Sequence, residues 1–117
     1  MGDRANVNVK ASEDDKGVFL YTHWSGTELP VILKRALAKR WRWGDDQYLA
    51  RIIFDEMIGD RQGNETGYGI SSYCGDGNSR VLVVDTKSQS VSFDDKSWTF
   101  EEYISTPDDF KVWEYGQ

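Results

Sequence analysis

Apolar and polar positions alternate near the start of the chain and predict β-strands. Small apolar residues recur at every second position from Ala5 to Ala11, which is the period of a half-buried strand, and their small size favours the sheet edge. After a charged turn, Val18–Thr22 resumes as a strand rich in branched and aromatic residues. We expect the two segments to form a hairpin, with residues 1–17 an edge strand or partly frayed.

A helical period replaces this alternation after Gly26. Apolar residues at spacings of three and four predict an amphipathic helix over Leu29–Leu37, with Pro30 in its first turn. Its outer face carries four cations, Lys34, Arg35, Lys39 and Arg40. Asp45 and Asp46 supply capping acids for a second helix, which completes a helical hairpin. Its inward side chains are expected to be Tyr48, Leu49, Ile52, Ile53 and Met57.

The second half of the chain returns to strand patterns. Gly67–Tyr73 alternates small with large residues and Asp76-Gly77-Asn78 is a turn signal, so we expect a second hairpin with the apolar run Arg80–Asp85. That run has two apolar faces, which is typical of a central strand, and Ser90–Phe93 is expected to pair with it. Ser97 then caps a short helix that contains Phe100, Tyr103 and Ile104.

These elements predict the α+β class: an antiparallel sheet of about five strands packed against a helical hairpin, with a short C-terminal helix. The length fits a single domain over residues 1–117, because a chain of this size buries one core. Cys74 is the only cysteine, which excludes an intramolecular disulfide and favours a reducing, cytoplasmic location. No leader or membrane-spanning run is recognisable, so we expect no membrane association.

The net charge of −6 is distributed unevenly along the chain. Residues 27–51 hold six basic and three acidic residues, a net +3, whereas residues 94–117 hold seven acidic and two basic residues, a net −5. An acidic surface of mixed sign disfavours direct nucleic-acid binding. The paired acids Asp94-Asp95 and Asp108-Asp109 either imitate a phosphate backbone toward a protein partner or form an ordinary solvated face.

Three tryptophans flank the first predicted helix: Trp24 precedes it, and Trp41 and Trp43 follow it. Arg40 and Arg42 alternate with the last two, and Trp with Arg is the composition of interface hot spots. The competing interpretation is that the indoles close the core where the helices meet the sheet. We expect at least one of them to be exposed and to anchor a protein partner, together with the acidic pairs.

The only histidine, His23, lies at the corner between the second strand and the first helix. A nucleophilic dyad with Cys74 would lack an orienting third residue. A triad with Ser25 would require a nucleophile elbow, which Trp24-Ser25-Gly26 is not. One His and one Cys cannot complete a structural zinc site. We therefore predict no catalytic residue, no metal and no cofactor, with His23 bonded within its own turn.

A set of motifs runs through the middle of the chain. Its members are Tyr21–Gly26, Leu29-Pro30, Arg35–Leu37, Arg42–Asp46, Tyr48–Phe54 and Glu65–Ser71. The set resembles small uncharacterised proteins of bacteria and their phages, over about Val18–Phe93. That group has no established activity, but the resemblance implies a phage or mobile-element inhibitor that blocks a host factor, including defence complexes such as CRISPR effectors. Ser25 stands where the pattern has Asp.

Three functional hypotheses follow. The leading one is a non-enzymatic binding protein that blocks a protein complex by steric or acidic-surface occlusion. The alternative is a small ligand-binding domain or enzyme centred on His23, which requires Tyr21, Tyr68 and Cys74 to converge with it on one pocket. The third is an assembly protein, which would be a stable oligomer with a large apolar interface.

Overall fold

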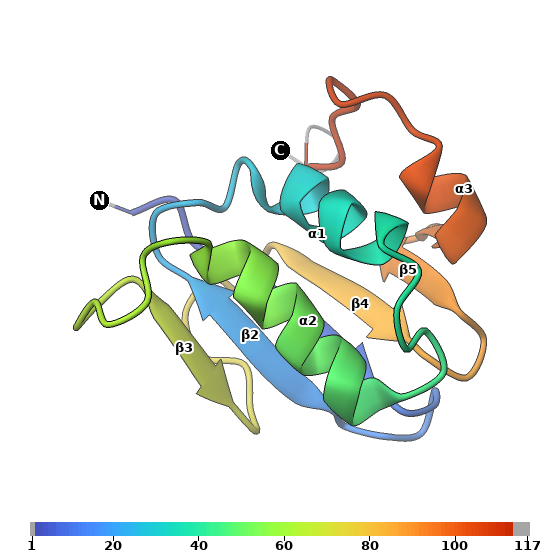
Figure 1. Cartoon of the computed structure of the whole chain (residues 1–117), viewed down its shortest axis with the longest axis horizontal. Helices are drawn as coiled ribbons and strands as arrows, with labels where there is room; N and C mark the ends of the chain where they lie inside the picture. The colour runs from blue at the N-terminus through green and yellow to red at the C-terminus, as the bar shows by residue number, and fades with distance from the viewer. Residues whose placement is uncertain (1, 114–117) are drawn as a thin grey trace.

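The computed structural model describes residues 2–113, which form six strands and three helices (Figure 1). The strands are β1 (Ala5–Lys10), β2 (Val18–Thr22), β3 (Tyr68–Ser71), β4 (Val81–Asp85), β5 (Ser90–Phe93) and β6 (Lys96–Thr99). The helices are α1 (Leu29–Ala38), α2 (Asp46–Ile58) and α3 (Phe100–Ile104). The α+β class, the helical hairpin and the short C-terminal helix are confirmed.

The strands form one sheet in the order β3-β2-β1-β4-β5-β6. All neighbouring strands are antiparallel except β1 and β4, which run parallel with Asn6 beside Val81 and Asn8 beside Val83. The sheet is therefore mixed and has six strands, where about five antiparallel strands were expected. Two differences account for this: the hairpins β1–β2 and β4–β5 join through one parallel contact, and β6 was not anticipated.

The expectation that the first strand lies at the sheet edge is wrong. β1 is central, and its apolar side chains Ala5, Val7 and Val9 are fully buried beneath the helices. Asn6 and Asn8 are also buried, on the opposite face. Their amides donate to loop carbonyls, Asn6 Nδ2 to Asp76 at 2.8 Å and Asn8 Nδ2 to Lys16 at 3.0 Å. Because the side-chain amides of Asn6 and Asn8 are hydrogen-bonded, both residues can be buried. A strand that alternates polar with apolar residues can therefore occupy a central position in the sheet.

β3 does not form a hairpin with β4, so the predicted second hairpin is also wrong. β3 pairs with β2 at the edge, and residues 72–80 cross the face opposite the helices, visible behind the blue strands in Figure 1. The predicted turn at Asp76-Gly77-Asn78 serves this crossing. Gly77 has φ 76°, and a Cβ there would lie 3.0 Å from the Ala5 nitrogen. Glycine allows both the left-handed backbone and the close approach to β1.

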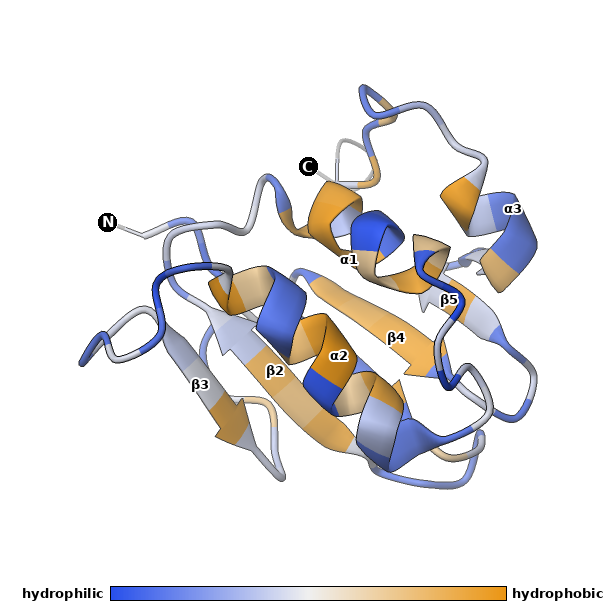
Figure 2. Ribbon diagram, in the orientation of Figure 1, coloured by the Kyte–Doolittle hydropathy of each residue, from blue (hydrophilic) through white to orange (hydrophobic). Residues whose placement is uncertain are grey.

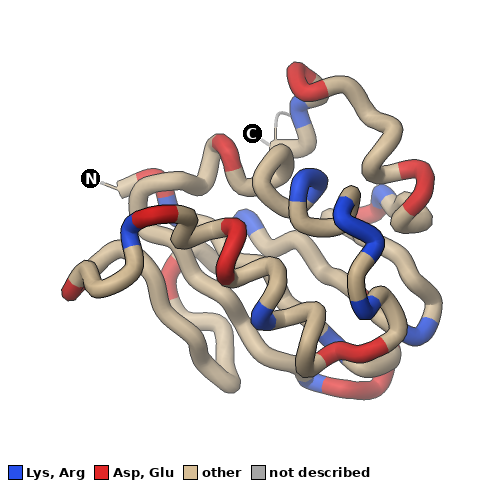
Figure 3. The backbone as a smooth tube through the Cα atoms, viewed as in Figure 1, with Lys and Arg blue, Asp and Glu red and all other residues tan. Residues whose placement is uncertain are grey.

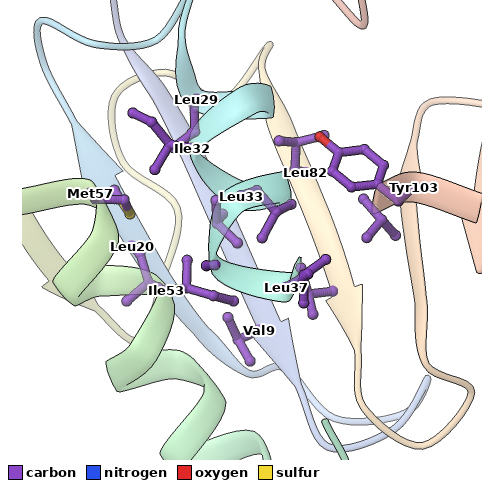
Figure 4. Close-up of a cluster of buried hydrophobic side chains, with 14 of the residues drawn as sticks. Val9, Leu20, Leu29, Ile32, Leu33, Leu37, Ile53, Met57, Leu82 and Tyr103 are labelled. Carbon is purple, nitrogen blue, oxygen red and sulfur yellow. The ribbon is translucent and has the colours of Figure 1, made fainter. Parts of the chain in front are cut away.

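Helices α1 and α2 cover the other face of the sheet, with α1 between α2 and α3 (Figure 1). Apolar residues colour stretches of both helices and most of β4 in Figure 2, and the core joins Leu33 and Leu37 of α1 to Ile53 of α2 and Leu82 of β4 (Figure 4). The predicted inward residues of α1 are all buried. Tyr48 was wrongly placed inward, because it lies in the first turn of α2 beyond the sheet and is exposed.

Lys34 was expected on the outer face of α1 but is buried. The segment after α3 folds back over it, so that Lys34 Nζ donates to the Thr106 carbonyl at 2.7 Å and forms an ion pair with Asp108. The long aliphatic stem packs while the ammonium reaches polar partners. This contact ties α1 to the C-terminal segment.

α3 begins at Phe100 and is capped by Thr99, not by Ser97 as predicted. Thr99 and Glu102 form a capping box: the Thr99 hydroxyl accepts from the Glu102 amide, and the Glu102 carboxylate accepts from the Thr99 amide. Ser97 is instead part of β6. Tyr103 of α3 is buried, donates to the Pro30 carbonyl at 2.8 Å and has its pKa raised by burial.

We expect Asn6→Ala to lower the free energy of unfolding by about 1 to 3 kcal/mol, because it takes the buried amide donor from the Asp76 carbonyl, while the Gly77 carbonyl keeps the Arg80 amide. Urea unfolding followed by circular dichroism measures this change. Asn78→Ala, in the same crossing but exposed, is the matched control and should change stability by less than about 0.5 kcal/mol. Equal stability of the two variants would contradict the structural role of Asn6.

Candidate partner-binding surface

The loop between α1 and α2, residues 39–45, has an unusual backbone; we call it the Trp41 loop. α1 ends without a glycine, and Arg40 takes the left-handed conformation with φ 61°, its amide donating to the Leu37 carbonyl at 3.0 Å. Arg42 is also left-handed, with φ 57°. Each such residue costs about 1 to 2 kcal/mol when it is not glycine. Other contacts must therefore hold this loop in place.

Side-chain contacts of the two arginines supply that support. Arg40 binds both carboxylate oxygens of Glu101 in α3, at 2.5 and 2.9 Å, and its guanidinium carbon lies 5.2 Å from the centroid of the Trp43 ring. The Arg42 guanidinium lies over the Tyr48 ring, 4.5 Å from its centroid. Asp45 then caps α2 by accepting from the amides of the second and third residues of its first turn. The loop is fixed at both ends.

The two tryptophans of the loop have opposite environments. The Trp43 indole donates to the Leu37 carbonyl at 2.9 Å and meets Phe100 edge to face, so it closes the core between α1 and α3. Trp41 is 57% exposed, and the Lys39 ammonium lies 5.2 Å from the centroid of its ring. Trp43 thus follows the core interpretation, while Trp41 is available to a partner.

Trp24 is 54% exposed but lies at the other end of α1. Its ring packs edge to face on His23 at a centroid distance of 4.1 Å. The ten residues of α1 separate Trp24 from the Trp41 loop by about 15 Å of helix. The predicted tryptophans therefore form two surfaces rather than one.

The predicted acids do not form one continuous face. Asp94 and Asp95 form the turn between β5 and β6, whereas Asp108 and Asp109 lie after α3. The acids of the C-terminal region face the cations of α1 and the Trp41 loop (Figure 3). Hydrogen bonds from Lys34 and from Arg40 hold the pKa values of Asp108 and Glu101, respectively, below their usual range. The last four residues of the predicted acidic region, 114–117, lie outside the described residues.

His23 was expected to bond within its own turn, but its side chain contacts Tyr21 of β2 and the distant Arg4 instead. The Tyr21 hydroxyl lies 2.8 Å from His23 Nδ1, and Arg4 Nε donates to the same nitrogen at 3.3 Å. Beside Tyr21 is a cleft of about 180 Å³ on the side of residues 69–76. Ser25 is buried, and its amide donates to Thr22. His23 therefore joins a small polar cluster at the end of β2.

The other two residues of the ligand-site hypothesis do not join this cluster. Tyr68 pairs with Thr22, so its side chain lies on the helix-covered face while Tyr21 projects from the opposite face. Arg61 lies over the Tyr68 ring. Cys74 has its thiol pKa raised by burial, which disfavours the thiolate that nucleophilic chemistry needs. Within residues 2–113, Cys74 is not among the hydrogen-bond partners of the His23 side chain.

Within the described chain, no three His, Cys, Asp or Glu side chains are placed to hold a metal ion. Among the helices of residues 2–113, none has both the length and the apolarity needed to cross a membrane. Comparison with known proteins finds no matching family model, curated protein or solved structure. The resemblance to phage proteins thus stays a prediction.

The sequence did not indicate the contribution of Tyr48 or the backbone of the Trp41 loop. Tyr48 fits the apolar spacing of a helix, which hides its role as the support of Arg42. Helices commonly end in a left-handed glycine, but here Gly44 comes several residues after the left-handed Arg40. A usable signal was the absence of glycine between the end of the apolar pattern and Trp41.

We expect Trp43→Ala to lower the free energy of unfolding by about 2 to 4 kcal/mol, because it removes a partly buried indole that packs against Phe100 and donates to the Leu37 carbonyl. Trp41→Ala, the matched control, should change it by less than about 0.5 kcal/mol. Thermal and urea unfolding of both variants provides the measurement. A Trp41→Ala protein as unstable as Trp43→Ala would show that both indoles are structural.

The Lys34–Asp108 ion pair predicts a pH dependence of stability. Since the folded pKa of Asp108 lies below its ordinary value of 3.8, the pair stabilises the fold above that pH, and this stabilisation disappears as pH falls through the folded pKa. Asp108→Asn should therefore be less stable than the wild type at neutral pH and converge with it in acid. Asp109→Asn is the control, measured by unfolding at several pH values. A constant Asp108→Asn deficit down to the acid limit would refute this linkage.

Proposed function

We propose that this chain is a non-enzymatic binding protein that engages a protein partner through the Trp41 loop. The observation that supports this most directly is an indole 57% exposed between two left-handed arginines, each of which is held by an aromatic ring. Strained, well-supported backbone is commonly found at functional sites. A solvent-facing tryptophan at its tip is otherwise unfavourable, and a partner surface would bury it.

The chemistry of the loop fits the pattern of interface hot spots. Trp, Tyr and Arg are the residues enriched there, and Trp41, Arg42 and Tyr48 are adjacent and exposed. Contacts of Arg40, Arg42 and Asp45 hold the backbone of the loop before binding, so less conformational entropy is lost there when the indole enters a pocket. We infer an apolar pocket on the partner, bordered by groups that accept hydrogen bonds from Arg42. Occlusion of the partner would then be steric.

The acidic residues have a different part in this proposal from the one first expected. Asp108 and Glu101 are paired with cations of the same chain, and Asp95 lies 3.8 Å from the Lys96 ammonium, so Asp94 and Asp109 are the predicted acids that remain for outward contacts. A partner that these acids attract would have to span from the β5–β6 turn to the segment after α3. That the partner belongs to a host defence complex stays a prediction from the resemblance alone.

We do not propose the ligand-site hypothesis as the main function, because only Tyr21 of its three supporting residues contacts His23. Tyr68 lies on the other face of the sheet, and the Cys74 thiol has a raised pKa. The residues that line the cleft beside Tyr21 include Ser71 but neither His23 nor Cys74, the two residues on which that hypothesis depends.

Affinity capture with three immobilised proteins tests the proposal: the wild type, Trp41→Ala and Trp24→Ala. The two substitutions remove indoles of nearly equal exposure, 57% and 54%, from opposite ends of α1, so each controls for nonspecific hydrophobic capture by the other. We expect a hot-spot loss of about 2 kcal/mol or more, a roughly 30-fold weaker affinity, for Trp41→Ala only. Quantitative mass spectrometry followed by titration of the recovered protein measures this difference.

Two results would contradict the proposal. One is a specific partner that Trp41→Ala retains with unchanged affinity. The other is equal loss with both variants, which would indicate general stickiness of exposed indoles. Arg42→Lys adds a finer control, because it keeps the charge but weakens the planar contact with Tyr48.

A further inference from the structure

The outer edge of β3 carries backbone groups that no strand of the described chain pairs with. The His23 amide donates to the Gly67 carbonyl at 2.9 Å, and the register pairs Tyr21 with Gly69. Backbone groups in an antiparallel strand alternate between its two sides. Those of Gly67 and Gly69 therefore face β2, and those of Tyr68 and Ile70 point outward.

This edge lacks two of the usual protections against pairing, charges and prolines. Natural edge strands are shielded by short length, charges, prolines, bulges or covering elements, and of these β3 has the short length of four residues. Residues 66–75 contain neither a charge nor a proline, and the side chains of Ile70 and Tyr73 are 60% and 70% exposed. The opposite edge differs, because β6 carries Lys96 and leads into α3, and its Trp98 packs on Tyr103. The open edge at β3 lies at the left of Figure 1.

We propose that two copies of this chain associate by antiparallel pairing of their β3 strands, forming one continuous sheet. In one register, every outward backbone N–H and C=O of Tyr68 and Ile70 forms a hydrogen bond to the other copy. That register places the two-fold axis at Gly69. Tyr68 of each copy then lies opposite Ile70 of the other, and four backbone hydrogen bonds form. The two Gly69 residues face each other at the axis, where the absence of side chains permits close approach.

The lack of charge at this edge is compatible with a second copy as its occupant. Each copy carries a net charge of −6, so two copies repel each other overall. The ten uncharged residues 66–75 let the two copies meet without such opposition. Tyr68 and Ile70 also form an aromatic–β-branched pair across the strands, a favourable combination. The edge is identical on both copies, as an isologous two-fold interface requires.

This interface is separate from the proposed function. β3 and the Trp41 loop lie on opposite sides of the molecule in Figure 1. Dimerisation and partner capture can therefore fail independently, and a dimer would present two Trp41 loops.

Sedimentation velocity and light scattering test the proposal on the full chain from about 1 µM to about 1 mM, the Kd range of weak complexes. Ile70→Pro removes an outward N–H without touching the bonds to β2, a position where edge strands accept proline. Because two symmetry-related bonds are lost, we expect the dimer Kd to rise about tenfold or more. Ile70→Lys keeps the N–H but adds an edge charge, and it should weaken the dimer as well. Ile70→Val is the control and should leave the Kd within about twofold.

Amide hydrogen exchange gives a second measurement. In the wild type, the Tyr68 and Ile70 amides should exchange more slowly as concentration rises, while Gly69, already bonded to β2, should change less. A wild type that stays monomeric up to the highest concentration overturns the proposal. So does a dimer that folded Ile70→Pro or Ile70→Lys leaves intact, since its interface would lie elsewhere.

Discussion

Burial of both faces of β1 is the constraint on which the rest of the fold depends. One face carries small apolar side chains that let α1 and α2 approach the sheet, and the other carries Asn6 and Asn8, whose amides need acceptors. Those acceptors are carbonyls of the crossing at residues 76–77 and of the β1–β2 connection. Satisfying Asn6 holds the crossing against the sheet, and the crossing in turn carries the chain from β3 at one edge to β4 beside β1.

A second set of contacts holds the C-terminal segment and the Trp41 loop together. Lys34 reaches Thr106 and Asp108, Arg40 reaches Glu101, and Tyr103 reaches the Pro30 carbonyl. Exposed ion pairs contribute little by themselves. Here they accompany the burial of Phe100 against Trp43, so their main effect is to fix geometry. The left-handed Arg40 is held by its two hydrogen bonds to Glu101 of α3 and by its contact with the Trp43 ring.

Local sequence patterns predicted the helices and strands well, but they did not predict which strands lie side by side in the sheet. The period of α1, the Asp45 cap and the apolar run of β4 were each readable, because local spacing and capping chemistry determine them. The central position of β1 was not, since its alternating asparagines look solvated until the carbonyls that bind them are known. The pairing of β3 with β2 instead of β4 depends on that same long-range contact. For the candidate site, exposure of one tryptophan was predictable, whereas the choice of Trp41 over Trp43 depended on α3.

The uneven charge of the chain also has a structural explanation. The basic stretch around α1 and the acidic stretch after β5 appeared to be separate surfaces, each available to a partner. In the fold they face each other, and at least two of their pairs are bonded across the α1–α3 contact. A carboxylate that already accepts from a lysine or arginine of its own chain must lose that bond before it can imitate a phosphate. Direct mimicry of nucleic acid is therefore costly for this protein. The exposed indole of the Trp41 loop can bind a partner without breaking an ion pair of its own chain.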